Sequence, residues 1–165
     1  MRFVVQVVSR AAVTILPEES KTGSGVHDTG ETRAIGKGFA VLIGIGCEDT
    51  AEIADKMVDK LLGLRVFADE NGKTNLSLAN VDGALLLVSQ FTLYADCRHG
   101  NRPGFTKAAP PDLAEKLYQY IIQKCRACVA DVKTGEFGAY MQVSLTNDGP
   151  FTILLDSDEL VKKKS

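Results

Sequence analysis

Apolar residues at the start of the chain are too closely spaced for a simple alternation with polar residues. Four valines fall within residues 2–9, and a second apolar run covers residues 11–16. Alternation is typical of a strand with one buried face, whereas a continuous run is typical of a strand covered on both faces. The pattern therefore predicts two successive strands, the first of them buried on both sides.

Residues 17–33 interrupt this pattern with Ser, Thr, Gly and Glu, which favours an extended hairpin loop or insertion. In the next run, Gly36 and Gly38 suit a turn or a bulge. Further strands are predicted at residues 35–45, 84–91, 137–146 and 151–155.

Two segments have the signals of helices. Asp49 and Glu52 form a plausible capping box, and residues 53–62 carry apolar side chains at helical spacing. Pro110-Pro111-Asp112 places proline and an acid at the start of a second helix, which continues through residues 113–124.

Six or seven strands (a rough count from the runs) and two helices predict an α/β fold with mixed or antiparallel sheets. Two main helices are too few to cover both faces of such a sheet, so we expect them on one side and more sheet on the other. At 165 residues the chain fits a single domain spanning residues 1–165, with a frayed tail at 157–165.

The composition excludes several classes of protein. The net charge of −2 gives no general attraction to nucleic acid, and the longest apolar runs are too short to cross a bilayer. A charged and apolar leader is missing, so we expect a cytoplasmic protein. The Cys125-x-x-Cys128 pair falls in the last turns of a predicted helix without a partner pair, which favours packed thiols over redox chemistry or a metal site. Neither a metal nor another cofactor is predicted.

Two polar segments follow buried strands and are the best candidates for a binding site. Ser89-Gln90-Phe91-Thr92-Leu93 ends the run at 84–88, and residues 147–152 read Asn-Asp-Gly-Pro-Phe-Thr. Strand ends can present main-chain donors and acceptors to a ligand. The Gly149-Pro150 dipeptide is either an ordinary hairpin turn or, if its bond is cis, a pair of carbonyls pointing the same way.

Protein-based nucleophilic catalysis has weak support. Ser89 and Thr92 each need a base, and His99 would have to fold back on them with Asp96 or Asp148 behind it. The other histidine, His27, lies in the polar insertion. Alternatively, the Thr92 hydroxyl satisfies the backbone at a strand end. If the protein is an enzyme, its chemistry therefore relies on main-chain groups, hydroxyls or the substrate itself.

Basic residues gather directly after the first polar segment. Arg98, His99, Arg102 and Lys107 lie within ten positions of one another, and three lysines occupy positions 162–164. Such a loop is either a solvated surface or a contact for phosphates.

Taken in order, several motifs closely resemble D-aminoacyl-tRNA deacylases of the widespread bacterial and eukaryotic type. They are Met1-Arg2-x-Val-Val-Gln, Leu64-Arg65-Val66-Phe67 with Asn75-Leu76-Ser77-Leu78, Ser89-Gln90-Phe91-Thr92-Leu93-Tyr94, Arg98-x-Gly-Asn-Arg-Pro, Ala109-Pro110-Pro111-Asp112-Leu113-Ala114, Thr134-Gly135-x-Phe137-Gly138-Ala139-x-Met141-Gln142-Val143 and Thr146-Asn147-Asp148-Gly149-Pro150-Phe151-Thr152. The resemblance covers nearly the whole chain.

This resemblance implies an α/β/β layering and a homodimer whose active sites lie at the interface. The Gly149-Pro150 pair of one subunit would enter the pocket of the other as a Gly-cisPro motif, and its carbonyls would reject L-side chains. Glycine has no side chain to reject, so glycyl-tRNA mischarged on tRNA-Ala is an expected second substrate.

The resemblance also implies roles for single residues. Ser89 and Gln90 would fix the 3′-terminal adenosine, and the main chain of Phe91 and Thr92 would hold the aminoacyl group. Further residues would shape the pocket (Met141 and Ala109) or contact the acceptor stem (Arg98, Arg102 and Lys107). The 2′-hydroxyl of the terminal adenosine would assist ester cleavage, so positioning and oxyanion donors could suffice without a triad.

Two features depart from the family pattern. Val7 stands where relatives carry an arginine that steadies the Gly-Pro carbonyls, which puts the stringency of chiral rejection in question. The insertion around residues 21–31 has no assigned role.

The function predicted is hydrolysis of D-aminoacyl-tRNA to D-amino acid and free tRNA. The alternatives are a non-catalytic nucleic-acid-binding module, a Ser/Thr esterase of other small esters that depends on His99, and a family member relaxed in chirality.

Overall fold

Strand β1 (Arg2–Leu16) organises the whole fold. A computed structural model describes residues 1–18 and 30–161 of the protein. In it, β1 pairs with β3 (Gly38–Gly44) through its first half and with β2 (Glu31–Ile35) through its second half. It also pairs with β8 (Tyr140–Asp156) along almost its full length. All three pairings are antiparallel.

The prediction of two separate strands at 2–9 and 11–16 is wrong, because the chain stays extended through Ser9 and Arg10. The ladder with β8 instead shifts register on either side of Val8. Such an irregularity lets a long strand bend without ending. Each half of β1 therefore pairs with a different neighbour.

Two further strands extend the sheet beyond β3. Strand β6 (Ala84–Ser89) runs parallel to β3, and β7 (Val132–Thr134) runs parallel to β6, which gives the order β2-β1-β3-β6-β7. Gly38 is required where β3 meets β6, because a Cβ there would lie 1.9 Å from the carbonyl oxygen of Ala84. The backbones can approach this closely only without a side chain.

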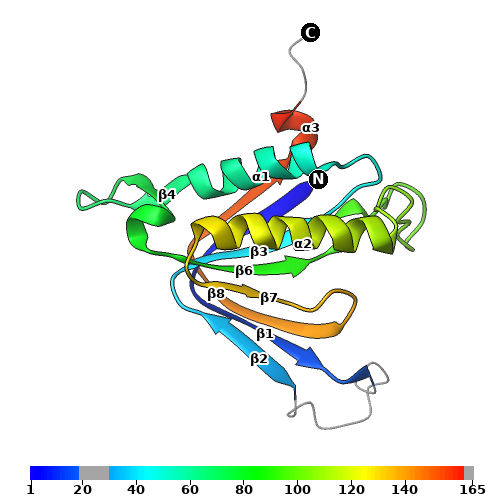
Figure 1. The fold of residues 1–165 in the computed structure, drawn as a ribbon, viewed down its shortest axis with the longest axis horizontal. Coiled ribbons are helices and arrows are strands. Elements are labelled where there is room, and N and C mark those ends of the chain that lie inside the picture. Colours follow the sequence, from blue (N-terminus) through cyan, green and yellow to red (C-terminus); the bar gives the residue numbers. More distant parts are fainter. Residues whose placement is uncertain (19–29, 162–165) are drawn as a thin grey trace.

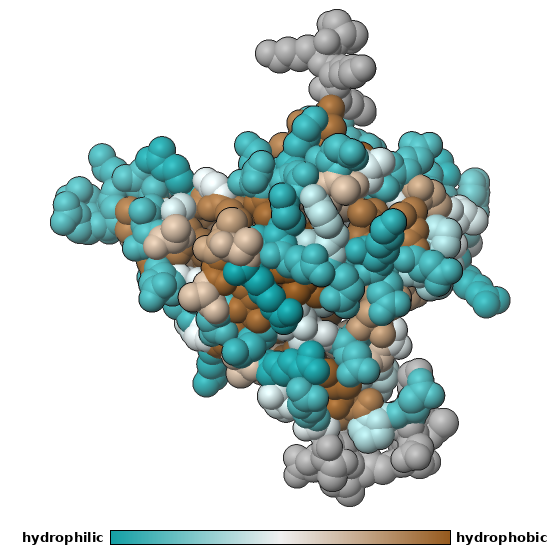
Figure 2. Space-filling model, in the orientation of Figure 1, coloured by the Kyte–Doolittle hydropathy of each residue, from teal (hydrophilic) through white to brown (hydrophobic). Residues whose placement is uncertain are grey.

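Helices α1 (Ala51–Gly63) and α2 (Pro111–Cys128) cover one face of the sheet, as Figure 1 shows. One core lies between these helices and the sheet and contains Phe3, Phe39, Met57, Leu87 and Tyr118. A second core lies on the opposite face, where residues of β1 and β2 pack on β3 and β6. The predicted α/β single domain, with its main helices on one side and more sheet on the other, is confirmed. Hydrophilic side chains cover most of the face seen in Figure 2.

The remaining elements are short. They are the hairpin of β4 (Arg65–Ala68) and β5 (Thr74–Ser77), the 3₁₀ turns η2 (Ala79–Val81) and η3 (Phe91–Tyr94), and α3 (Ser157–Leu160). The predicted insertion at 17–33 overlaps β2, and residues 19–29 lie outside the described part. The tail predicted to fray from residue 157 instead begins with α3, because Asp156 caps it by accepting a bond from the Asp158 N–H.

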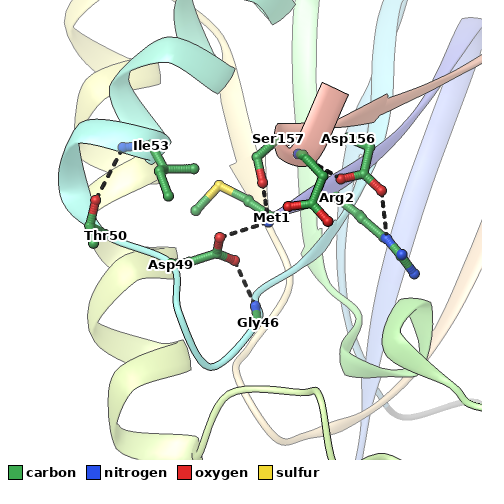
Figure 3. Close-up of polar contacts among 9 residues, drawn as sticks. Met1, Arg2, Gly46, Asp49, Thr50, Ile53, Asp156 and Ser157 are labelled. Carbon is green, nitrogen blue, oxygen red and sulfur yellow. Dashed lines mark hydrogen bonds and ion pairs between the residues drawn. The ribbon is translucent and has the colours of Figure 1, made fainter. Parts of the chain in front are cut away.

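Asp49 does not cap α1 as predicted. Thr50 is the N-cap, and its hydroxyl accepts the Ile53 N–H at 3.4 Å. Asp49 instead accepts the Met1 ammonium at 2.7 Å, while its other oxygen accepts the Gly46 N–H at 2.6 Å (Figure 3). The same ammonium donates to the Ser157 hydroxyl at 2.6 Å. A buried ion pair therefore joins β1, the loop before α1, and α3.

Candidate functional site

A pocket of about 640 Å³ opens where β3 and β6 end. The carboxyl ends of parallel neighbouring strands lie at the same edge of a sheet, a common place for a ligand site. Ile45 follows β3, and Ser89, Gln90 and Phe91 follow or end β6. The rest of the lining comes from the segment before α2, the first turns of α2, the loop between β7 and β8, and the start of β8.

Most residues predicted for the pocket are brought together there. Ser89, Gln90 and Phe91 line it beside Ala109 and Met141, although these residues are up to 52 positions apart in sequence (141 − 89). Thr92 is not among the lining residues, but its hydroxyl accepts a 2.5 Å hydrogen bond from the Gln90 amide. The Thr92 hydroxyl is therefore hydrogen-bonded to a residue that lines the pocket.

The main chain of η3 presents donors beside this pocket. The Gln90 N–H donates to the Ile43 carbonyl at 2.7 Å, and the Leu93 N–H donates to the Gln90 carbonyl at 3.3 Å. In the described part of the chain, no carbonyl is found to accept the N–H groups of Phe91 and Thr92 that lie between them. The first N–H groups of a helical turn lack partners within it, so these two are available to a ligand.

Aromatic side chains that the sequence analysis did not assign complete the pocket. Phe105 lines it and packs edge-on against Phe91 with ring centroids 4.9 Å apart, and both rings are exposed. Phe137 and Tyr140 also line the pocket, the first from the loop between β7 and β8 and the second from the start of β8. Phe137 lies within one of the quoted motifs, so the sequence could have assigned it to the pocket. Phe105 lies in none of these motifs, and only the folded structure brings it to the pocket.

Gly149 and Pro150 lie within β8, and neither lines the pocket of their own chain. Two strands were predicted around this turn, but β8 is assigned as one strand across it, because pairing with β1 continues on both sides. The peptide bond between the two residues is cis. Asn147 supports the segment by accepting the Phe151 N–H at 2.7 Å and donating to Thr152 at 2.8 Å. The dipeptide itself is exposed.

No catalytic triad is assembled among residues 1–18 and 30–161. Asp96, a predicted partner of His99, instead binds the Arg98 guanidinium at 2.6 and 2.9 Å, and this pairing holds the pKa of its carboxyl well below its usual range. His99 and Thr92 are both exposed, and no hydrogen bond joins them. His27 lies outside the described residues.

The basic loop borders a second, open hollow of about 490 Å³ next to η3. Arg98 and Lys107 line it together with Arg2, whose guanidinium donates to the Leu93 carbonyl at 2.9 Å. Arg102 is exposed but does not line this hollow. Two of the three predicted phosphate contacts therefore lie on one surface beside the pocket.

Strand β8 carries an unusual number of exposed apolar side chains. Among the described residues it pairs with β1 alone, and its large exposed residues are Tyr140, Val143, Leu145 and Leu154, the last 59% exposed. An apolar surface of this kind on a small protein usually marks an interaction site. Val7 makes no part of it, because its side chain is buried in the core under the helices.

The described residues lack the features of two other classes of protein, those that bind a metal and those that cross a membrane with a helix. They contain no cluster of three or more His, Cys, Asp or Glu side chains placed to hold a metal. None of their helices combines the length and the apolar character needed to span a membrane. Cys125 is buried, and Cys128 is exposed on the same helix.

The chain resembles known proteins over nearly its full length. A family profile described as D-Tyr-tRNA(Tyr) deacylase matches residues 4–156. A protein named D-aminoacyl-tRNA deacylase from Thermosipho africanus (strain TCF52B) is 48% identical, over 97% of this chain and 99% of that protein. Another of the same name, from Bifidobacterium adolescentis (strain ATCC 15703 / DSM 20083 / NCTC 11814 / E194a), is 50% identical over the same shares.

Two solved structures share the fold. One titled "c-Myc DNA Unwinding Element Binding Protein" superposes with a TM-score of 0.82 at 42% identity, covering 94% of this chain and 98% of its own. A second, titled as a probable eukaryotic D-amino acid tRNA deacylase, gives a TM-score of 0.77 at 17% identity, covering 93% and 97%. At that identity the second structure supports the fold alone.

Proposed function

Because the chain belongs to the D-Tyr-tRNA(Tyr) deacylase family, we propose that it hydrolyses the ester bond of D-aminoacyl-tRNA. The products are a free D-amino acid and intact tRNA. The observation that carries this proposal is the convergence of Ser89, Gln90, Ala109 and Met141 on one pocket. These residues come from separate motifs of the family pattern.

The 3′-terminal adenosine occupies the pocket in this proposal. The Ser89 hydroxyl and the Gln90 side chain fix the nucleotide, while Ala109 and Met141 shape the walls. The aminoacyl carbonyl lies against Phe91 and Thr92, whose main-chain N–H groups have no carbonyl partner in the described chain. Donors of this kind stabilise the oxyanion that forms when water attacks an ester.

The reaction needs no protein nucleophile. Water adds to the ester carbonyl carbon, the bond to the ribose 3′-oxygen breaks, and a proton is delivered to that oxygen as the 3′-hydroxyl is restored. The neighbouring 2′-hydroxyl of the substrate assists these proton movements. The Thr92 hydroxyl, held by Gln90, positions the substrate and does not attack it. An aminoacyl ester is already activated, so positioning supplies much of the rate.

Selection against L-aminoacyl groups requires a second subunit. The Gly149-Pro150 dipeptide is exposed and lies outside the pocket of its own chain, so it is available to a partner's pocket. The exposed apolar residues of β8 supply the surface on which two copies associate. The carbonyls of the dipeptide then exclude an L-side chain, and glycyl-tRNA mischarged on tRNA-Ala is accepted because glycine has nothing to exclude.

The acceptor stem lies along the basic loop. Arg98 and Lys107 border the hollow beside η3, and Arg102 extends from the same loop. Because Asp96 holds Arg98, we expect Arg102 and Lys107 to contribute more to phosphate binding. Replacing both with Ala weakens tRNA binding and flattens its dependence on salt. Unchanged binding by the double variant refutes this surface.

The deciding experiment compares D-Tyr-tRNA, L-Tyr-tRNA and glycyl-tRNA-Ala as substrates. We expect rapid release of D-Tyr and glycine and little release of L-Tyr. A non-catalytic nucleic-acid-binding module hydrolyses none of the three. A His99→Ala variant with full activity excludes the Ser/Thr esterase alternative. Measurable L-Tyr release by the unaltered protein identifies a member relaxed in chirality.

The role of the second subunit is tested separately. Light scattering measures the mass in solution, and we expect a dimer. Replacing Gly149 and Pro150 together with Ala leaves D-Tyr release intact and raises L-Tyr release. A fully active monomer, or discrimination unaffected by the double replacement, contradicts selection in trans.

A further inference from the structure

The side chain of Arg33, on the edge strand β2, reaches β7, the strand at the other end of the sheet. Arg33 lies opposite Val13 in the β1–β2 ladder. Its Nη1 group donates to the Thr134 carbonyl at 2.9 Å and to the Gly135 carbonyl at 3.4 Å, while its Nε group donates to Glu31 at 2.8 Å. Thr134 and Arg33 are 101 positions apart in sequence.

The two carbonyls lie where the chain leaves β7. Thr134 is the last residue of that strand and one of the few buried polar residues of the described chain. β7 is the end strand of the sheet, so carbonyls at its end depend on side chains or water for partners. The Gly135 N–H is already bound to the Leu87 carbonyl at 3.0 Å. Arg33 therefore completes the hydrogen bonding of this corner.

The next residues form a wall of the substrate pocket. A Cβ added at Gly135 would lie 2.7 Å from the Met141 sulfur, so the corner is packed directly against that side chain. The Glu136 N–H also donates to the Met141 sulfur at 3.3 Å. Residues 137–141 all line the pocket. A movement of the Thr134 and Gly135 carbonyls is thus transmitted to Met141 and to the rest of this wall.

We propose that Arg33 is a positioning residue for the pocket: it fixes the corner at Thr134 and Gly135 and thereby the wall from Phe137 to Met141. Guanidinium suits this task because its rigid fork serves several acceptors at once, whereas an ammonium is a point donor on a flexible stem. The Glu31 carboxylate accepts a hydrogen bond from the Nε group of Arg33 and so orients the guanidinium. The substrate part of this inference rests on the proposed function.

Two variants and a matched control test it. Arg33→Leu removes all donors, and Arg33→Lys keeps the charge but not the fork. Arg65→Leu is the control, because Arg65 also donates to a main-chain carbonyl, that of Asn75 at 2.8 Å, but in the β4–β5 hairpin and not at the pocket wall. Steady-state kinetics with D-Tyr-tRNA are measured well below the melting temperature of each variant.

We expect kcat/KM to fall about tenfold in Arg33→Leu, mainly through KM, which corresponds to the loss of about 1.4 kcal/mol of substrate binding. Arg33→Lys falls between this variant and the unaltered protein, and Arg65→Leu matches the unaltered protein. Kinetics of Arg33→Leu that equal those of Arg65→Leu overturn the proposal.

A second readout does not depend on activity. The protein has three methionines, so ¹³C-methyl methionine labelling gives three NMR signals. Met1 and Met57 are buried in the core under the helices, and only Met141 contacts the corner. In Arg33→Leu we expect the Met141 signal to shift and the other two to stay. An unchanged Met141 signal, or equal shifts of all three, overturns the positioning role, whereas a protein inactive on every aminoacyl-tRNA refutes only the proposed function.

Discussion

Replacing Asp49 with Asn removes the counter-ion of a buried cation. The Met1 ammonium is fully buried and the Asp49 side chain is 6% exposed, with 2.7 Å between the paired atoms. The Asn side chain has a similar size and can still accept one hydrogen bond, so the variant tests the charge. Breaking a buried pair by removing one partner costs about 3–5 kcal/mol, because the remaining charge stays away from water.

That cost is a large share of the roughly 5–15 kcal/mol by which domains are stable. For a domain of this size each kcal/mol shifts the melting temperature by about 2–4 °C, so we expect a loss of about 6–20 °C. Calorimetry and urea unfolding measure it on protein tagged at the C-terminal end, which leaves the Met1 amino group unaltered.

Asp55→Asn is the matched control. Asp55 also pairs with a cation, Lys124, at 3.0 Å, but both side chains are more than one third exposed. Pairs of this kind contribute little to stability, so this variant should melt close to the unaltered protein. If Asp49→Asn melts as high as Asp55→Asn, the charge of Asp49 does not stabilise the buried Met1 ammonium, which contradicts the prediction.

Three further outcomes are expected. Tyr118→Phe removes the 2.8 Å hydrogen bond to the buried Leu87 carbonyl, which keeps the Gly135 N–H as a donor, and should lower the free energy of unfolding by about 0.5–1.5 kcal/mol in urea titrations; no change contradicts it. Burial raises the pKa of Cys125 to about 12, so at pH 8–9 its thiol stays protonated and should resist iodoacetamide while exposed Cys128 reacts; equal labelling rates contradict it. Gly38→Ala should fail to fold or melt far lower, because its Cβ would overlap a carbonyl of β6; a normal melting curve rules out that close approach.

Periodicity predicted most strands and both main helices because each depends on neighbours close in sequence. The run at 84–88 became the buried part of strand β6, and the stripe after residue 53 became the buried face of α1. The resemblance to the deacylase family implied that Ser89, Ala109 and Met141 share a site, and they line one pocket. The predictions of strands and helices hold because a hydrophobic pattern determines which face of an element is buried.

Contacts between distant segments were decided only by the tertiary structure. Asp49 had the sequence context of a helix cap but is the partner of Met1, 48 positions away. Arg33 fell within a predicted insertion but binds Thr134, 101 positions away. The hydrogen-bond partner of Arg33 depends on the arrangement of the strands. That arrangement determines which carbonyls at the end of β7 come within reach of the arginine side chain. Local pattern therefore determined the elements, and packing of those elements determined the partners.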